Sequence, residues 1–149
     1  MQIQTKPYGT IQIDDRQVIN FPFGILGFEN FRDFALLDAQ QQPFYWLQSL
    51  AVKEIAFILI NPWLFRPDYS LDIMQEDLEE IGITDKDQAL VFAIVTVPEN
   101  QSKMTANLQG PIVINKETHQ ARQCISTNQK WKIRHNILDE LAKMRNEAC

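Results

Sequence analysis

The side chains that could perform covalent chemistry in this sequence are few and stand apart from one another. The two histidines are His119 and His135, and the two cysteines are Cys124 and Cys149. Nucleophilic catalysis needs a thiol or hydroxyl beside an oriented base, and none of these residues lies in such a motif. We expect His119 to be solvated at the start of a strand and Cys124 to be a core residue. The sequence therefore predicts a protein that is not an enzyme.

Motifs for metals, phosphates and cofactors are also absent. The chain has no H-E-x-x-H, no C-x-x-C, no glycine-rich phosphate loop and no dinucleotide fingerprint, so no cofactor is expected. Two cysteines form neither a disulfide framework nor a metal-ligand spacing. No apolar run approaches the roughly 20 residues that span a bilayer, and residues 1–6 do not begin a signal peptide. We expect a cytoplasmic protein with reduced thiols and no membrane contact.

The composition fits one soluble domain over residues 1–149, since 45% of the residues are hydrophobic and 22% are charged. A net charge of −5 and a pI near 5.0 argue against direct nucleic-acid binding. The charge is uneven along the chain. Residues 68–87 hold eight acids against Lys86 alone, which gives −7, whereas residues 116–134 hold five bases against Glu117, which gives +4.

The apolar centre of the sequence is residues 91–115, VFAIVTVPENQSKMTANLQGPIVIN. Val and Ile suit a packed pleated sheet, and polar and apolar residues alternate in MTANL. Proline and glycine break the pattern, so we predict three neighbouring strands at 91–97, 104–108 and 111–114. The most buried positions are expected to include Phe57, Ile58, Leu59, Val91, Ala93, Val95, Ile112 and Ile114.

The rest of the chain reads as short strands and two helices. Further strands are predicted at 2–6, 10–13, 17–21, 34–37, 44–47, 56–60 and 119–125. One helix is expected to begin at an Asp72 cap paired with Gln75 and to end at Gly82. A last helix at about 136–148 is capped by Asn136, and its apolar stripe is Ile137, Leu141, Met144 and Ala148. The stripe either packs on the barrel or forms a free arm for a partner. The predicted fold is mainly β, an antiparallel barrel-like single domain with one or two short helices.

Several segments resemble the FliW family of flagellar assembly factors when taken in order. They are FPFGILGFE at 21–29, FYWLQS at 44–49, NPWLFRPDYSL at 61–71, AIVTVPE at 93–99, MTANL at 104–108 and GPIVIN at 110–115. The resemblance extends to about Arg134 and implies the same barrel-like fold. It also implies a non-catalytic regulator that binds the translational repressor CsrA and relieves repression of flagellin synthesis, with flagellin as the competing partner.

The acidic segment is the predicted partner-binding region. Four acids are expected to face solvent together on the first helix, where they would steer a basic partner, although solubility alone could explain them. Phe65 and Tyr69 are the expected apolar anchors beside them. The candidate partner-binding residues are Phe65, Asp68, Tyr69, Glu76, Asp77, Glu79, Glu80 and Asn107.

Two other functions remain open. A flagellin chaperone would need an apolar groove for amphipathic helices, and the candidates are the phenylalanine-rich loop at 21–34 and the region of Trp46 and Trp63. That loop is otherwise interpreted as pinned to the core by its aromatic side chains. A small-ligand-binding barrel or an enzyme is the remaining alternative, but converging polar residues for it are not found in the sequence.

Overall fold

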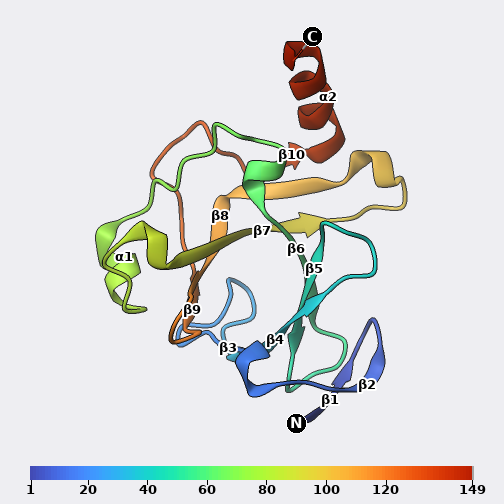
Figure 1. Ribbon diagram of the computed structural model, residues 1–149, viewed down its shortest axis with the longest axis vertical. Helices are drawn as coiled ribbons and strands as arrows, with labels where there is room; N and C mark the ends of the chain where they lie inside the picture. The colour runs from blue at the N-terminus through green and yellow to red at the C-terminus, as the bar shows by residue number, and fades with distance from the viewer. Residues whose placement is uncertain (149) are drawn as a thin grey trace.

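The computed structural model describes residues 1–148, without the side chains of residues 147 and 148 (Figure 1). Within these described residues, ten strands form two sheets, and two α-helices and four 3-10 turns connect or flank them. The strands are β1 (Gln2–Thr5), β2 (Gly9–Gln12), β3 (Val18–Asn20), β4 (Asp33–Asp38), β5 (Tyr45–Ser49), β6 (Ala56–Ile60), β7 (Ala89–Thr96), β8 (Thr105–Asn115), β9 (Ala121–Gln123) and β10 (His135–Asn136). The helices are α1 (Gln75–Glu79) and α2 (Ile137–Ala148).

The main sheet curls into a nearly closed antiparallel barrel, which confirms the predicted fold class (Figure 1). Its strand order is β10-β8-β7-β6-β5-β4-β3, and β9 pairs with β8. The two ends of the sheet approach each other where Asn20 bridges Gln120, and the Asn20 amide donates to the His119 carbonyl at 3.0 Å. The hairpin β1–β2 forms a separate two-stranded sheet beside the barrel.

Apolar side chains pack on both faces of the curled sheet. Every strand from β3 to β9 contributes to the cluster inside the barrel, whose buried strand residues are Ile19, Phe34, Leu47, Leu59, Phe92, Ile112, Ile114 and Ala121. A second cluster lies outside β7 and β8, under the irregular chain of residues 61–83, and a third lies under the β1–β2 hairpin. Val95 and Ile112 are buried as predicted, whereas Phe57 and Ile58 are only half-buried.

The strands predicted at 104–108 and 111–114 are one continuous strand, so the expected break at Gly110-Pro111 is wrong. β8 stays paired with β7 across a bulge, where the register passes from Phe92 opposite Ile112 to Ile94 opposite Asn107. Pro111 has no amide hydrogen to donate, and a bulge is a place in a sheet where that donor is not needed.

The helix predicted from Asp72 is shorter and begins later. α1 covers Gln75–Glu79, its N-cap position is Met74, and no side chain caps it. Asp72 instead accepts hydrogen bonds from Ser70 and from Asn128 Nδ2, the latter at 3.0 Å. Its carboxylate therefore binds a residue distant in the sequence instead of capping the helix. Gly82 ends the turn with a φ of 75°, as predicted.

The last helix is close to its predicted bounds. Asn136 Oδ1 accepts from the Asp139 amide at 2.9 Å, the expected cap. Ile137 is buried and Leu141 packs against the outer core cluster, so the first turns of the predicted stripe lie on the barrel. The rest of α2 projects from the barrel (Figure 1). The side chain of Ala148 and all of Cys149 lie outside the described residues.

The predicted strand at 119–125 is only partly formed. β9 covers Ala121–Gln123, and His119 has a φ of 61°, a left-handed conformation that ends strand pairing. Asn115 holds this turn, because its Oδ1 accepts from the Glu117 and Thr118 amides and its Nδ2 donates to the Ile81 carbonyl.

Candidate protein-interaction face

Residues 61–71 cover the outer core cluster, with the side chains of Phe65 and Tyr69 turned inward and Trp63 38% exposed. Phe65 is fully buried, and Tyr69 is 4% exposed, with its hydroxyl donating to the Leu108 carbonyl at 3.1 Å. The Trp63 indole donates to the Tyr69 carbonyl at 2.8 Å and fixes the backbone there. The expectation that Phe65 and Tyr69 are apolar anchors on the surface is therefore wrong, because neither side chain is accessible to a partner.

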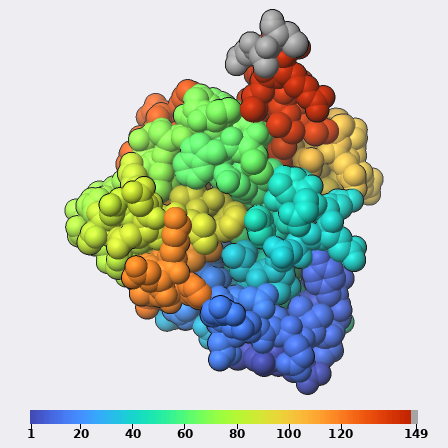
Figure 2. All heavy atoms as spheres, viewed as in Figure 1, coloured from blue at the N-terminus to red at the C-terminus, as the bar shows by residue number. Residues whose placement is uncertain are grey.

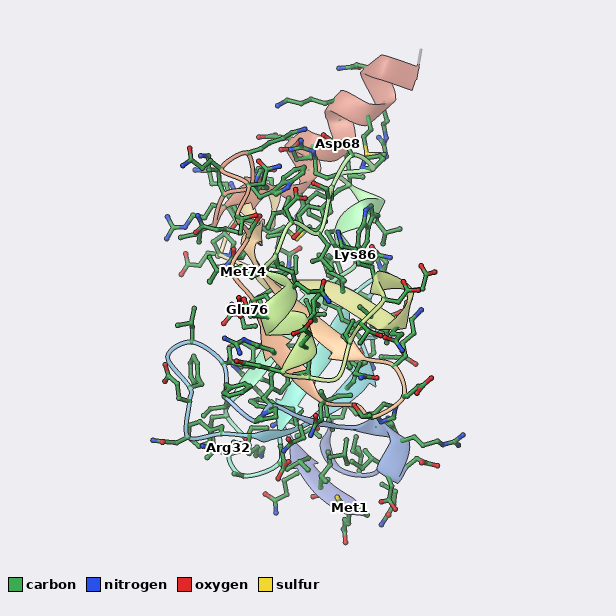
Figure 3. All side chains as sticks on the ribbon, turned by 90° about the vertical axis from the view of Figure 1, so that its left-hand side faces the viewer. Met1, Arg32, Asp68, Met74, Glu76 and Lys86 are labelled. Atoms are coloured by element: carbon green, nitrogen blue, oxygen red, sulfur yellow. The ribbon has the colours of Figure 1, made fainter. Side chains whose placement is uncertain are left out.

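Asp68 lies at the α2 end of the acidic segment, inside a network of charges (Figure 3). It pairs with Arg66 at 2.9 Å and with Lys130 at 2.7 Å, and these hydrogen bonds hold its pKa well below the usual range. Arg66 also pairs with Glu140 of α2 at 3.3 Å. Asp68 is thus already balanced by two internal cations.

The same network ties α2 to the barrel. Both cations lie over the buried Trp131 ring, with Arg66 Cζ at 4.8 Å and Lys130 Nζ at 4.9 Å from its centre. His135 Nε2 accepts from the Lys132 amide at 2.8 Å, which places the proton on Nδ1, 3.4 Å from Glu140. Burial lowers the pKa of His135, against the opposing effect of Glu140. We call Arg66, Asp68, Lys130, Trp131, His135 and Glu140 the Arg66 network.

The four acids of α1 and its C-cap divide into two pairs. Arg122 of β9 reaches Asp77 at 3.5 Å and forms a short ion pair with Glu80. Glu76 and Glu79 are exposed and form no ion pair with any residue of the described chain. Only part of the predicted four-acid face is therefore unbalanced, and Figure 3 shows Glu76 beside Met74 on the flank of the molecule, away from Asp68.

Asn107 has an internal role that its sequence context does not reveal. Its Oδ1 accepts from the Gln109 amide at 3.0 Å and from the Gly110 amide at 2.8 Å. The Gly110 carbonyl in turn accepts from Gln123 Nε2 at 3.2 Å, so the bulge of β8 is joined to β9. A side chain at Gly110 would lie 3.0 Å from Gln123 and 3.2 Å from Asn107, so the bulge has little room for one.

An apolar groove lies on the other flank of the barrel. A row of outward-facing partners crosses the sheet through Leu37, Trp46, Ile58, Val95 and Ala106. The outer members of the row are buried, but Trp46 and Ile58 are partly open. They form the floor of a groove of about 410 Å³ lined by Pro7, Tyr8, Ala39, Gln40, Gln41, Phe44, Trp46, Ile58, Val97, Gln101 and Met104. Trp63, predicted to share this region, packs on Tyr69 instead.

The residues considered for chemistry lie apart in the structure. Cys124 is 1% exposed, and burial raises the pKa of its thiol to about 12. His135 belongs to the Arg66 network, and His119 lies in the turn after β8. Among residues 1–148, no three His, Cys, Asp or Glu side chains are grouped as metal ligands. No helix in the described chain is both long and apolar enough to cross a membrane.

Comparison with known proteins extends over nearly the whole chain. The FliW protein family model matches residues 2–137. The chain is 48% identical over 141 residues to the flagellar assembly factor FliW of Treponema denticola, covering 95% of this chain and 96% of that protein. It is 44% identical over 150 residues to the Treponema pallidum protein of the same name, covering all of both. The crystal structure of a flagellar assembly factor FliW matches with a TM-score of 0.84 at 35% identity, covering 92% of this chain and 96% of that one.

Proposed function

The chain belongs to the FliW family, and on that premise we propose that it is a flagellar assembly factor that works by binding proteins rather than by catalysis. In this proposal it captures the basic repressor CsrA in the cytoplasm and so relieves repression of flagellin synthesis. Flagellin is the competing partner, which displaces CsrA by binding this chain. Control of flagellum assembly is then a switch between two protein complexes.

The observation that carries this proposal is the pair of exposed, unbalanced carboxylates on α1. Three other acids predicted for this region are occupied, since Asp77 and Glu80 pair with Arg122 and Asp68 pairs with Arg66 and Lys130. Glu76 and Glu79 therefore present to the solvent negative charge that no ion pair within the described residues offsets. Such a surface attracts a basic protein and accelerates its association.

Binding of the purified proteins tests the proposal. We expect the wild-type chain to form a complex with the CsrA protein of the same organism, measured by calorimetry, and to free CsrA-bound flagellin leader RNA in a gel-shift assay. Added flagellin should reverse that release. Lysozyme, a protein unrelated to the pathway, should not. Failure of the wild-type chain to bind CsrA would overturn the proposed switch.

The apolar groove favours a second candidate function, a flagellin chaperone. Tyr8, Phe44, Trp46, Ile58 and Met104 give the groove an apolar surface, and no charged residue lines it. An amphipathic helix buries its apolar stripe in a groove of this kind. The terminal helices of flagellin supply such stripes, so the groove is the proposed flagellin site.

One substitution in the groove tests this candidate. Val97 is 42% exposed at the groove wall, so Val97→Glu should leave the fold intact while placing a charge in the apolar site. We expect weaker binding of a synthetic flagellin terminal-helix peptide, measured by the fluorescence change of Trp46. Ile125→Glu, at a 50% exposed residue outside the groove, is the matched control. Equal peptide binding by both variants would exclude the groove.

A further inference from the structure

The phenylalanine-rich loop between β3 and β4 is held rigidly by its inward-facing residues. Phe21 and Ile25 are buried, and Phe21 packs edge-on against Phe34 with ring centres 5.3 Å apart. Phe28 packs against Phe57 at 5.1 Å. The loop is thus pinned to the core through Phe21, Ile25 and Phe28, as its aromatic content predicted.

A tight turn fixes the tip of this loop. Gly24 has a φ of 68°, and a Cβ there would lie 2.4 Å from the Glu29 backbone, so only glycine fits. The Phe28 amide donates to the Ile25 carbonyl at 2.6 Å, and the Gly27 amide donates to the Glu29 carboxylate at 3.0 Å. The backbone of the tip is therefore held in place without the help of the Phe23 and Leu26 side chains.

Two large apolar side chains on this rigid tip face the solvent. Phe23 is 50% exposed and Leu26 is 62% exposed. Isolated exposed apolar residues are ordinary on protein surfaces, but these two lie three residues apart on one glycine-locked turn. We call Phe23 and Leu26 the apolar tip.

Strand β9 joins the apolar tip to the acidic helix. Arg122 Cζ lies 4.7 Å from the centre of the Phe23 ring while the same guanidinium pairs with Asp77 of α1 and with Glu80 at its C-cap. The neighbouring Gln123 accepts from the Leu26 amide at 3.0 Å. Figure 2 shows the orange atoms of the β9 region between the yellow-green atoms of α1 and the blue atoms of the N-terminal third.

These contacts produce one face with two kinds of chemistry. The apolar tip is on one side of Arg122, and α1 with its unbalanced Glu76 and Glu79 is on the other. Figures 1 and 3 place the loop and α1 on the same flank of the barrel, with the loop below the helix. Arg122 is balanced by Asp77 and Glu80, so it does not cancel the negative charge offered to a partner.

From this juxtaposition we infer that the apolar tip and α1 together form one docking surface for a basic amphipathic segment. The segment sets apolar side chains against Phe23 and Leu26 and directs lysine or arginine side chains to Glu76 and Glu79. Charge complementarity selects the occupant, because an acidic segment would be repelled and a neutral apolar one would leave the carboxylates unpaired. The inference rests on the proposed function and supplies the apolar anchors that Phe65 and Tyr69 do not provide.

Each part of this surface has a different kinetic effect. Exposed charges mainly alter association rates, whereas apolar anchors mainly alter dissociation rates. The variant Phe23→Ser/Leu26→Ser should therefore dissociate from CsrA about ten-fold faster or more, with an association rate near that of the wild type. Ile133→Ser, at a 59% exposed residue outside this face, is the matched control and should dissociate at the wild-type rate. An unchanged melting temperature checks that the tip variant is folded.

A second probe separates this inference from the proposed function. A designed peptide of alternating leucine and lysine clusters forms a basic amphipathic helix without any relation to CsrA. The wild-type chain should bind it, with amide chemical-shift changes at residues 23–26 and 76–79, and the tip variant should not. If the wild-type chain binds the peptide as expected but does not bind CsrA, the proposed function is overturned and the docking surface is not. Equal dissociation of wild type and tip variant from either probe would overturn the docking surface.

Discussion

Two groups of charges on this protein use similar residues for different purposes. In the Arg66 network, Arg66 and Glu140 have side chains that are 17% and 15% exposed, and every charge faces an opposite one. Around Arg122, the side chains of Arg122, Asp77 and Glu80 are 25%, 23% and 46% exposed, and two further acids on α1 have no cation. The first group fastens α2 to the barrel, while the second leaves charge available for binding. A run of acids in a sequence can thus contain both kinds of residue.

The largest expected difference between the two groups concerns their aromatic residues. Trp131 lies under two cations and is 1% exposed, so Trp131→Ala should lower the free energy of unfolding by about 3–5 kcal/mol. Phe23, whose ring lies under Arg122, is half exposed. Phe23→Ala should change the free energy of unfolding by about 0.5 kcal/mol or less. Urea denaturation of both variants measures the contrast. Equal losses would mean that the apolar tip is part of the core.

Substitution of Arg66 should also destabilise the protein more than substitution of Arg122. Arg66→Ala leaves Asp68 and Glu140 without their shared partner near a buried ring, and we expect a loss of about 1–3 kcal/mol. Arg122→Ala breaks ion pairs that water already screens, so about 0.5–1 kcal/mol is expected. Arg16→Ala, in a fully exposed pair with Asp14, is the control and should have no measurable effect. A larger loss for Arg122 than for Arg66 would reverse the comparison.

The Arg66 network should also make stability depend on pH. Burial lowers the folded-state pKa of His135, so protonation near and below the unfolded pKa of about 6.5 favours the unfolded chain. Stability due to neutral His135 is complete above that pH and is lost as the pH falls towards the folded pKa. Protonation also removes the acceptor of the Lys132 amide, while Glu140 attracts the charge and Arg66 opposes it.

The measurement is the urea midpoint at several pH values between 7.5 and 5.5. The wild type should lose stability as the pH falls, and His135→Gln should flatten that loss because glutamine can accept the hydrogen bond without titrating. His119→Gln is the control and should keep the wild-type slope. A slope that persists in His135→Gln would assign the pH dependence to another group.

The sequence predicts regular elements well where apolar runs have clear ends. β6 has its predicted bounds because a continuous apolar run stops at Asn61-Pro62, and the cap and bounds of α2 follow from Asn136 and its spacing. Periodicity carries no information about the irregular residues 61–71, so the burial of Phe65 and Tyr69 could not be read from it.

The candidate face depends on contacts between distant segments, and this limits what its sequence reveals. Arg122 meets Glu80 from 42 residues away, and the Leu26 amide meets Gln123 from 97 residues away. The sequence indicated the acids and the phenylalanine-rich loop separately, but no local pattern joins them. The signal that could have pointed to the tip is the Phe-Gly-Ile-Leu-Gly turn, whose two glycines allow a rigid loop with exposed side chains.

The free carboxylates of α1 are proposed to attract a basic partner. The most direct measurement is the association rate of CsrA with the variant Glu76→Gln/Glu79→Gln at low and high salt, by stopped-flow fluorescence. Because this variant leaves the ion pairs of Arg122 in place, the fold should be unchanged, in contrast to a variant that also removes Asp77 and Glu80. Glu54→Gln/Glu99→Gln, at exposed acids on other loops, is the matched control.

We expect several-fold slower association of the α1 variant at low salt and a weaker dependence of its association rate on salt, since screening acts over a Debye length of about 8 Å at physiological ionic strength. The control variant should behave as the wild type does. Association rates that are the same for the wild type and the α1 variant at low salt would contradict the claim and leave these carboxylates with a role in solubility alone.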